Sequence, residues 1–332
     1  MRDSRTILAI ETSCDDTCAA VVRDRRALSN VIHTQQEHRR YGGVVPEVAS
    51  RAHLERLDGV VRTALREAGA ELGDVDEVAV TVRPGLIGAL LVGVAAAKGI
   101  ACARRLPLAP VNHLEGHVAA AYLEDPGLEP PFVALVASGG HTVLYAVGKD
   151  RGMSLLGQTL DDAAGEALDK GARMLGLGFP GGPALQKAAA EGDDARYDFP
   201  VALRDGKNLN FSFSGLKTSL LYKIRGMSGE EVRAELPHLA ASYQRAVVEA
   251  LVSKLLRAAE LRDASTLVMA GGVAANAVLR ERLHKECKKR SLKLVIPSPR
   301  LCTDNAAMIG AAALSAEPLP YPHYLSLNAR SV

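Results

Sequence analysis

The sequence predicts an α/β protein of two related lobes, each built on a mostly parallel sheet, around a central cleft. Apolar, β-branched runs alternate with helical patterns along most of the chain, which is typical of βαβ units. The 332 residues exceed the roughly 250–300 residues that a single core usually holds. A pair of short strands joined by a polar turn also occurs twice. We therefore expect a duplicated fold, and a cleft between two lobes is a common place for a ligand.

The first half begins with the first strand pair. Apolar runs at 7–12 and 18–23 flank the polar turn Ser13-Cys14-Asp15-Asp16-Thr17. Apolar positions at helical spacing then predict a helix over 46–68. Alternating strands and helices complete this half, at 77–82, 86–104, 108–111 and 113–123.

The second half repeats this order with larger insertions. Strands at 132–137 and 142–147 flank the turn Ser138-Gly139-Gly140-His141. Helices are expected at 161–175, 182–191, 216–225, 230–262, 273–289 and 304–314, with strands at 266–270 and 293–297. The Pro-rich segment 125–131 marks the boundary. The expected domains are 1–127 and 128–332, with the last helix, at about 303–315, returning to the cleft.

Composition limits the function classes and the compartment. The net charge of +2 excludes a large basic surface, so any nucleic acid must use a local patch or a partner. The N-terminus has no apolar run of signal-peptide length. The most apolar stretch, 85–103, is short and interrupted by Lys98, so we expect no membrane span. Five scattered cysteines indicate reduced thiols and a cytoplasmic protein.

Three glycine pairs follow strands or open helices, as phosphate-binding and nucleoside-binding turns do. Ser138-Gly139-Gly140 can form an anion-binding nest, although a plain hairpin turn fits too. Gly271-Gly272 and Gly181-Gly182 both open helices. Asn276 can bind a purine or ribose, and Asp169 a ribose hydroxyl. A polar residue on a helix surface and a solvated carboxylate remain the alternatives.

His113-Leu114-Glu115-Gly116-His117 places two imidazoles at i and i+4 on one helix face, close enough to share a metal ion. Core or surface histidines are the alternative. In zincin proteases the Glu follows the first His directly, whereas Glu115 stands two residues after it. The best candidate for a third ligand is Asp304, at a helix start. Two His and one carboxylate suit iron(II) or zinc and leave positions open for a substrate.

Taken together, these motifs resemble the TsaD family, formerly called Gcp, the tRNA N6-adenosine threonylcarbamoyltransferases. The similar segments follow one another in the right order along nearly the whole chain. They are IETSCD at 10–15, VPE at 45–47, PGL at 84–86, HLEGH at 113–117, VASGGH at 136–141, LDDAAGEALDK at 160–170, FPGGP at 179–183, NFSFSGLKT at 210–218, AGGVAAN at 270–276 and TDNAAM at 303–308. The spellings ETSCD and HLEGH are similar to the bacterial or mitochondrial branch.

The resemblance implies an actin/Hsp70/sugar-kinase-like (ASKHA) fold and transfer of threonylcarbamoyl from threonylcarbamoyl-AMP to adenosine 37 of tRNAs that read codons beginning with adenine. It implies a divalent metal ion, Fe²⁺ before Zn²⁺, and partners of the TsaB and TsaE kind. The metal ligands would be His113, His117 and Asp304. The nucleotide contacts would be Val136, Ala137, Ser138, Gly139, Gly140, Asp169, Gly182 and Asn276. Asp15 is the candidate that orients or deprotonates the amine, although it can also merely cap its own turn.

The chain departs from the family pattern at three positions. Arg83 stands where many members have Gly, Asp16 where many have Glu, and Gln186 where several carry an acidic ribose contact, which is therefore not transferred to this chain. Two other functions stay open: a metal-dependent glycoprotease and a non-catalytic ATP-binding scaffold. The densest basic cluster comprises Lys285, Lys288, Lys289 and Arg290; it either contacts tRNA or is a solvated helix end.

Overall fold

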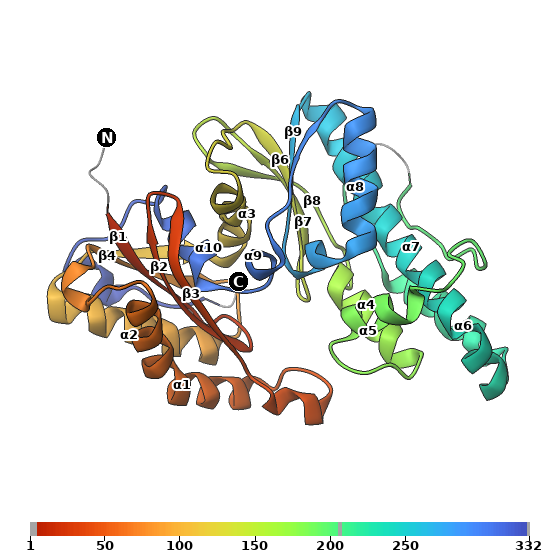
Figure 1. Cartoon of the computed structure of the whole chain (residues 1–332), viewed down its shortest axis with the longest axis horizontal. Coiled ribbons are helices and arrows are strands. Elements are labelled where there is room, and N and C mark those ends of the chain that lie inside the picture. The colour runs from red at the N-terminus through yellow and green to blue at the C-terminus, as the bar shows by residue number, and fades with distance from the viewer. Residues whose placement is uncertain (1–4, 205–207, 331–332) are drawn as a thin grey trace. The chain divides into compact units, whose positions relative to one another are not determined.

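A computed structural model of the chain describes residues 5–204 and 208–330 (Figure 1). The chain divides into two compact units. The first unit comprises Met1–Leu128 together with Thr303–Val332, and the second comprises Glu129–Cys302. Each unit has one sheet and its own apolar core, as expected for a chain too long for a single core.

The first unit is built on a five-stranded sheet in the order β3-β2-β1-β4-β5. Its strands are β1 (Thr6–Glu11), β2 (Asp16–Arg23), β3 (Arg26–Thr34), β4 (Glu77–Arg83) and β5 (Leu108–Asn112). Strands β1 to β3 form an antiparallel meander, and β4 and β5 add to β1 in parallel. Strand β1 is buried along its whole length, which explains its continuous apolar sequence.

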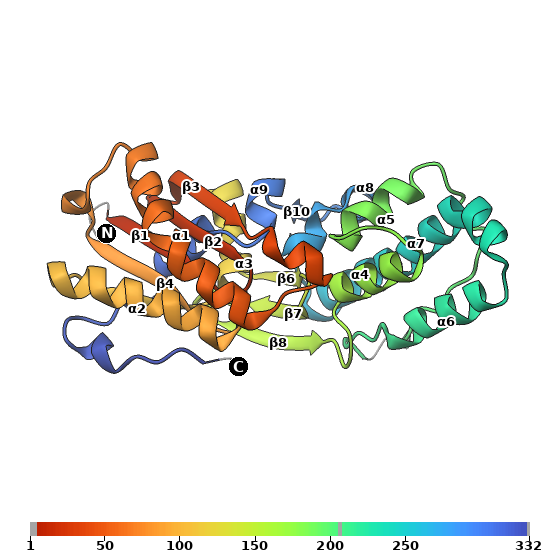
Figure 2. The same ribbon diagram turned by 90° about the horizontal axis from the view of Figure 1, so that it is seen from below.

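Helices cover both faces of this sheet. Helices α1 (Pro46–Glu67) and α2 (Ile87–Arg104) pack on one face (Figure 2). Helix α10 (Ala306–Ala313) packs on the other face, with α3 (His113–Glu124) beside it. The alternation of side chains along β1 separates the two layers. Leu8 and Ile10 join the core formed with α1 and α2, whereas Ala9 faces Gly310 of α10.

The second unit repeats the topology in the order β10-β9-β6-β7-β8. Its strands are β6 (Phe132–Ala137), β7 (Thr142–Val147), β8 (Met153–Gln158), β9 (Thr266–Ala270) and β10 (Lys293–Val295). Strands β6 to β8 are antiparallel neighbours, and β9 and β10 add in parallel. The two sheets therefore share one strand order and one set of directions, so the predicted duplication is confirmed.

The long helix α7 (Gly229–Arg262) supports the other helices of the second unit. It begins with a capping box, in which Ser228 and Glu231 bond each other's backbone N–H groups. Helices α4 (Ala164–Met174), α5 (Gly181–Ala189), α6 (Ser214–Arg225) and α8 (Ala277–Lys289) all contact it. The short helix α9 (Pro299–Cys302) and the 3-10 turns η1 (Glu37–Tyr41), η2 (Leu72–Asp74), η3 (Gly272–Ala275) and η4 (His323–Ser326) complete the described elements.

The predicted mostly parallel sheets are in fact mixed. The third strand of each antiparallel meander, β3 and β8, was not predicted. Both are edge strands with largely exposed or half-exposed residues, so they lack the apolar run that identified their neighbours. The predicted helix 273–289 is also divided, into η3 and α8, at Asn276.

The C-terminal segment differs from the predicted division, which assigned 128–332 to the second domain. Residues 303–330 belong instead to the first unit. Helix α10 is almost wholly buried and consists of small and apolar residues, so it packs closely against the sheet and α3. Beyond it, Leu319 pairs with Leu108 at the free edge of β5, and Lys98 donates to the carbonyl oxygen of Leu325. The tail thus covers an exposed sheet edge.

Helix α2 is the one helix in the described part of the chain that is long and apolar enough to cross a membrane by length and composition. Its length therefore does not exclude a span, contrary to the sequence-based expectation. Ala89, Leu90, Val94 and Ala97 are buried where α2 packs against β4 and α1, as in the core helix of a folded domain. One such helix is weak evidence for a membrane protein.

Candidate metal and nucleotide sites

His113 and His117 lie in the first two turns of α3, which begins directly after β5. The Asn112 side chain caps the helix by accepting from the Leu114 N–H at 2.8 Å. The i, i+4 spacing brings the imidazole ring centres to 4.6 Å from each other. His113 is 5% exposed and His117 fully buried. Two histidines that are both buried on one helix face are less common than two histidines at this spacing on a surface helix.

Helix α10 brings Asp304 to the two histidines. Asp304 Oδ1 lies 3.5 Å from His113 Nε2 and 3.3 Å from His117 Nε2. Gly116 lies at the contact of α10 with α3, where a Cβ would approach Ile309 Cδ1 to 2.7 Å and that side chain would have to shift. The structure thus brings together all three predicted ligand residues, with one ligand atom from each within 4.8 Å of the others.

The donor set fits a transition metal ion. Within the described residues, neither ring nitrogen of the buried His117 has a hydrogen-bond partner, although buried polar groups are nearly always bonded to protein, water or an ion. Burial lowers the pKa of His117 and favours the neutral form that ligates metals. Burial also acts on His113, but Asp304 and Glu11 outweigh it and raise its pKa to about 9.

Glu11, at the end of β1, holds His113 from behind. Its Oε2 lies 3.1 Å from His113 Nδ1, and the carboxylate also accepts from Thr81 Oγ1 and the Ser13 N–H. Burial opposes the charge, but His113 and the hydrogen bonds prevail, so the pKa of Glu11 is lowered. A carboxylate on Nδ1 leaves Nε2 for a metal, as in many metal sites. Sequence reasoning missed Glu11; its place at the end of a strand beside a polar turn was the available signal.

The turn between β1 and β2 carries two more carboxylates. Asp15 is partly exposed, and its backbone oxygen accepts from the Gln35 N–H. Asp16 Oδ1 is buried without a hydrogen-bond partner among the described residues. Burial, then the charges of Asp304, Asp15 and Glu11, raise the pKa of Asp16 to about 7, although a bond with Thr34 opposes this. A carboxyl group near neutrality can exchange a proton, so Asp16 joins Asp15 as a candidate.

The second unit contains a separate cavity of about 210 Å³. Four predicted nucleotide contacts line it: Gly139, Asp169, Gly182 and Asn276. Gly271 makes the strand-to-helix turn at its wall possible, with φ +88 and a Cβ position only 2.3 Å from the Ala137 carbonyl oxygen. The volume is below the roughly 300–1,000 Å³ of drug-sized sites, so the cavity suits part of a nucleotide.

The polar groups of Asp169 and Asn276 have partners within the chain. Asp169 Oδ1 accepts from the N–H groups of Gly181 and Gly182, at 2.8 and 3.1 Å. These two N–H groups at the start of α5 are therefore bonded within the chain. Asn276 caps α8 through the Leu279 N–H and donates to Gln244. Both side chains therefore shape the cavity by fixing α5 and α8.

The remaining predicted contacts lie outside the lining of this cavity. Val136 and Ala137 are fully buried in β6, so only their backbone can reach a ligand. Ser138 Oγ accepts from the His141 N–H and closes the hairpin turn, and Gly140 is exposed. The lining also includes Gly272, from a predicted glycine pair, Gln186, which the sequence analysis set aside as a ribose contact, and Gly165, which sequence reasoning missed. Gln186 lies one helical turn after Gly182, which was the available signal.

The basic cluster at the end of α8 is partly neutralised. Lys289 Nζ lies 2.9 Å and Arg290 Nη1 2.5 Å from the Glu286 carboxylate. Hydrogen bonds from these two cations lower the pKa of Glu286 to about 2. This arrangement favours the interpretation as a solvated helix end over a phosphate-binding patch.

Sequence comparisons extend over nearly the whole chain. The family model described as TsaD, tRNA N6-adenosine threonylcarbamoyltransferase, matches residues 26–311. Curated relatives carry the same name. The protein of Syntrophus aciditrophicus is 50% identical over 98% of this chain and 96% of its own length. The protein of Thermosipho africanus is 48% identical over 92% of each chain.

Solved structures with low identity share the fold. HypF of T. kodakarensis aligns with a TM-score of 0.62 at 15% identity, over 94% of this chain and 47% of its own. The (R)-2-hydroxyglutaryl-CoA dehydratase component A of Acidaminococcus fermentans aligns at 0.55 and 16% identity, over 94% and 97%. They confirm the predicted actin/Hsp70/sugar-kinase-like fold and carry no information on function at these identities.

Replacing His117 should remove the bound metal. We expect His117→Gln to lose it while keeping its circular dichroism spectrum, because a coordinating imidazole is lost at a buried position. The matched control is His53→Gln, since His53 is also buried but both its ring nitrogens are hydrogen-bonded, to Thr17 and the Cys14 carbonyl oxygen. Metal content by mass spectrometry checks this. Full occupancy in His117→Gln would place the metal elsewhere.

Neutralising Glu11 should weaken metal binding without removing a ligand. Loss of an outer-shell partner typically costs about 10–100-fold in affinity, and we expect a loss in this range for Glu11→Gln in competition with a chelator. Glu77→Gln is the control, because Glu77 is a buried carboxylate of the same sheet that pairs with Arg5. Equal losses in both variants would mean that Glu11 acts only on fold stability.

Filling the cavity should abolish nucleotide binding. A side chain at Gly272 would meet no atom within 4 Å, so Gly272→Val should fold normally and yet occupy ligand space. We expect at least a tenfold loss of AMP affinity by calorimetry, about 1.4 kcal/mol. Gly215→Val in α6 is the control, since Gly215 is equally unobstructed and lies outside the lining. Unchanged affinity in Gly272→Val would exclude this cavity.

Proposed function

The chain belongs to the TsaD family and is a tRNA N6-adenosine threonylcarbamoyltransferase, and on that premise we propose how its two sites act. The donor is threonylcarbamoyl-AMP, and the acceptor is the N6 amine of adenosine 37 in tRNAs that read codons beginning with adenine. The observation that carries this assignment to particular residues is the convergence of His113, His117 and Asp304 in a buried site, within a chain about 50% identical to named transferases along its length.

The reaction moves one carbonyl group between two heteroatoms. The N6 nitrogen attacks the carbamoyl carbon, the bond from that carbon to the phosphate oxygen breaks, and AMP leaves with the electron pair. The N6 proton passes to a carboxylate, which we assign to Asp15, with Asp16 as the second acceptor in the same turn. In the second unit, the glycines at 139, 182 and 272 leave room for the AMP part of the donor.

His113, His117 and Asp304 would hold one divalent metal ion, Fe²⁺ in preference to Zn²⁺. When bound, such an ion supplies Lewis acidity for a carbonyl or phosphoryl oxygen. The protein's own contribution is geometric. Glu11 fixes the tautomer and orientation of His113, and burial keeps water away from His117. The set leaves positions open, as a catalytic site requires.

The glycoprotease alternative needs a general base next to the metal ligands. Glu115 is exposed, whereas His113 and His117 on the same helix are buried, so its carboxylate lies on the opposite side of α3. That position does not support water activation of the zincin type. A purely ATP-binding scaffold would have no use for the buried donor set. Both observations favour the transferase.

The partners and the compartment are part of the same proposal. tRNA is the substrate of the family. Proteins of the TsaB and TsaE kind are the proposed protein partners, and threonylcarbamoyl-AMP is the second substrate. We place the protein in the cytoplasm, without a membrane, where tRNA and a reduced thiol pool occur together.

A single-turnover assay tests the assignment. We expect threonylcarbamoyl transfer from labelled threonylcarbamoyl-AMP to tRNA bearing adenosine 37, and none to tRNA bearing guanosine 37, because only adenosine offers the N6 amine. Asp15→Asn should slow the step by about 10²–10⁴-fold, the usual contribution of a general base. Release of AMP without labelling of tRNA, with TsaB-like and TsaE-like proteins present, would contradict transferase activity. A rate unchanged by Asp15→Asn would exclude Asp15 as the base.

A further inference from the structure

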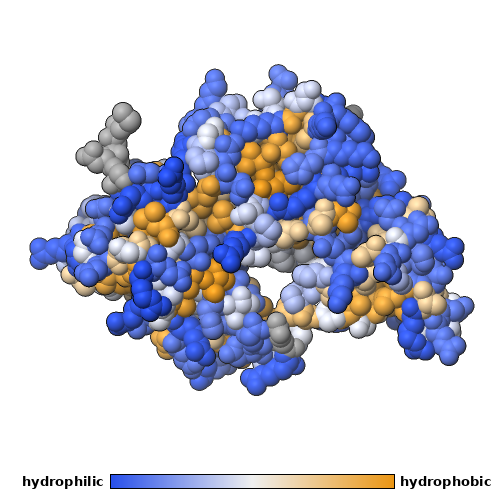
Figure 3. All heavy atoms as spheres, viewed as in Figure 1, coloured by the Kyte–Doolittle hydropathy of each residue, from blue (hydrophilic) through white to orange (hydrophobic). Residues whose placement is uncertain are grey.

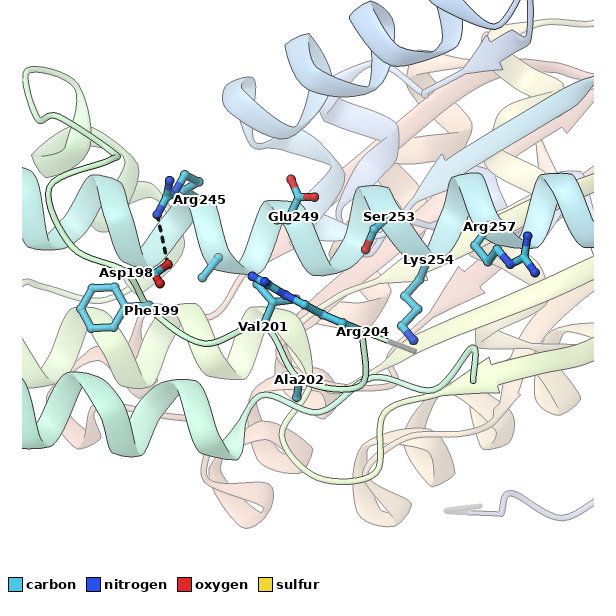
Figure 4. A pocket seen from close by; sticks show the side chains of 11 residues that line it. Asp198, Phe199, Val201, Ala202, Arg204, Arg245, Glu249, Ser253, Lys254 and Arg257 are labelled. Atoms are coloured by element: carbon cyan, nitrogen blue, oxygen red, sulfur yellow. Dashed lines mark ion pairs between the residues drawn. The ribbon is translucent and has the colours of Figure 1, made fainter. Parts of the chain in front are cut away.

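A second cavity, of about 490 Å³, lies along α7 in the second unit (Figure 4). None of the residues assigned above lines it. One wall is the helix, and the other is the segment 198–204, which includes the apolar residues Phe199, Val201 and Ala202. The volume falls in the range of ligand sites. On the face drawn in Figure 3 the molecular surface is mostly hydrophilic, with apolar residues gathered in separate patches.

Basic side chains dominate the polar lining. Four cations line the cavity, Arg204, Arg245, Lys254 and Arg257, against two acids, Asp198 and Glu249. Glu249 lies on the opposite side of α7 from Val201 and Ala202 in Figure 4, and it pairs with Arg282 of α8 at 3.6 Å. Arg257 in turn pairs with Glu260 at 2.9 Å, so Arg204, Arg245 and Lys254 against Asp198 leave the lining with a net positive charge.

A phosphate can displace Asp198, the second acid of the lining, from Arg245. Asp198 reaches Arg245 only at 3.8 Å, and its side chain is 98% exposed. Such an exposed ion pair contributes little to stability. A phosphate gains more from a guanidinium group, because two parallel N–H bonds fit its oxygens.

The segment that carries Arg204 is anchored to the helix. Lys254 is buried and donates to the carbonyl oxygens of Leu203 and Asn208, on both sides of this arginine. Arg245 donates to the carbonyl oxygen of Tyr197 at 3.2 Å. Arg204 itself is exposed. Arg245 and Lys254 thus bond α7 to Tyr197 and Leu203. A segment held in this way loses less conformational entropy when a ligand binds.

We propose that this cavity binds a backbone phosphate of the tRNA substrate through Arg204 and Arg245. The proposal rests on the proposed function, which makes a polyanion the partner of a chain with a net charge of only +2. Such a chain must collect its phosphate contacts locally. The rival patch at the end of α8 has two of its four cations bonded to Glu286. The cavity offers the better-placed guanidinium groups.

The test is the salt dependence of tRNA binding by the full chain. Each phosphate contact contributes about 0.7–0.9 to the log–log slope. We expect Arg204→Gln with Arg245→Gln to reduce the slope by about 0.7–0.9, the share of one phosphate, and the affinity at least tenfold. Arg204→Gln alone should reduce the slope by part of this amount, and it removes an exposed side chain without disturbing the hydrogen bonds that Lys254 and Arg245 donate to the segment. An unchanged slope in both variants would overturn the proposal.

Controls separate charge, ligand source and function. Arg51→Gln with Arg62→Gln removes the same charge from exposed positions of α1 and should leave the slope unchanged; an equal loss there would mean a general charge effect and overturn the site. Calorimetry with inorganic phosphate and with AMP tests whether the cavity instead binds a small phosphate compound. If Arg204→Gln with Arg245→Gln lost binding of these compounds but kept the wild-type salt slope for tRNA, the tRNA proposal would also be overturned. Wild-type chain that binds tRNA here but transfers nothing would contradict the proposed function alone.

Discussion

The close packing of α10 on α3 is the constraint on which the metal site depends. Asp304 is separated from His117 by nearly the whole second unit in sequence, and only this contact places its carboxylate 3.3 Å from the imidazole. Glycine at 116 and small residues in α10 allow this close approach, since a Cβ at 116 would displace the end of the Ile309 side chain. Helix packing thus substitutes for sequence proximity, and the C-terminal segment belongs to the first unit for the same reason.

Burial in this unit creates an electrostatic cost that the site resolves by pairing. Glu11 and His113 are both almost inaccessible, and an isolated buried charge would cost several kcal/mol. Each lowers the cost of the other, so the pKa of Glu11 falls while that of His113 rises to about 9. At His117 burial outweighs the opposing effect of Asp304, and the pKa is lowered. One imidazole is thereby oriented by a carboxylate and the other is kept free to ligate.

Local pattern and family resemblance predicted the strands β6, β7 and β9 and the histidine pair, because these signals lie within a few residues of one another. The edge strands β3 and β8 were missed because their exposed faces dilute the apolar signal. Glu11 could not be assigned, since its contact with His113 spans the sheet and depends on β5 leading into α3. The capping bonds of Asp169 and Asn276 were also out of reach, because a sequence cannot tell whether a polar side chain faces a ligand or its own backbone.

The duplication shows how one topology supports two kinds of chemistry. The turn after β1 and the turn after β6 occupy equivalent places in sheets of identical strand order. In the first unit that position carries carboxylates, and Glu11 at its start contacts His113, a proposed metal ligand. In the second unit it is Ser138-Gly139-Gly140, and Gly139 of this turn lines the proposed nucleotide cavity. The two equivalent turns have therefore diverged, one to acidic side chains and the other to glycines. The first serves the proposed proton transfer and metal binding, and the second serves the proposed binding of the donor. The strand order of the two sheets remains the same.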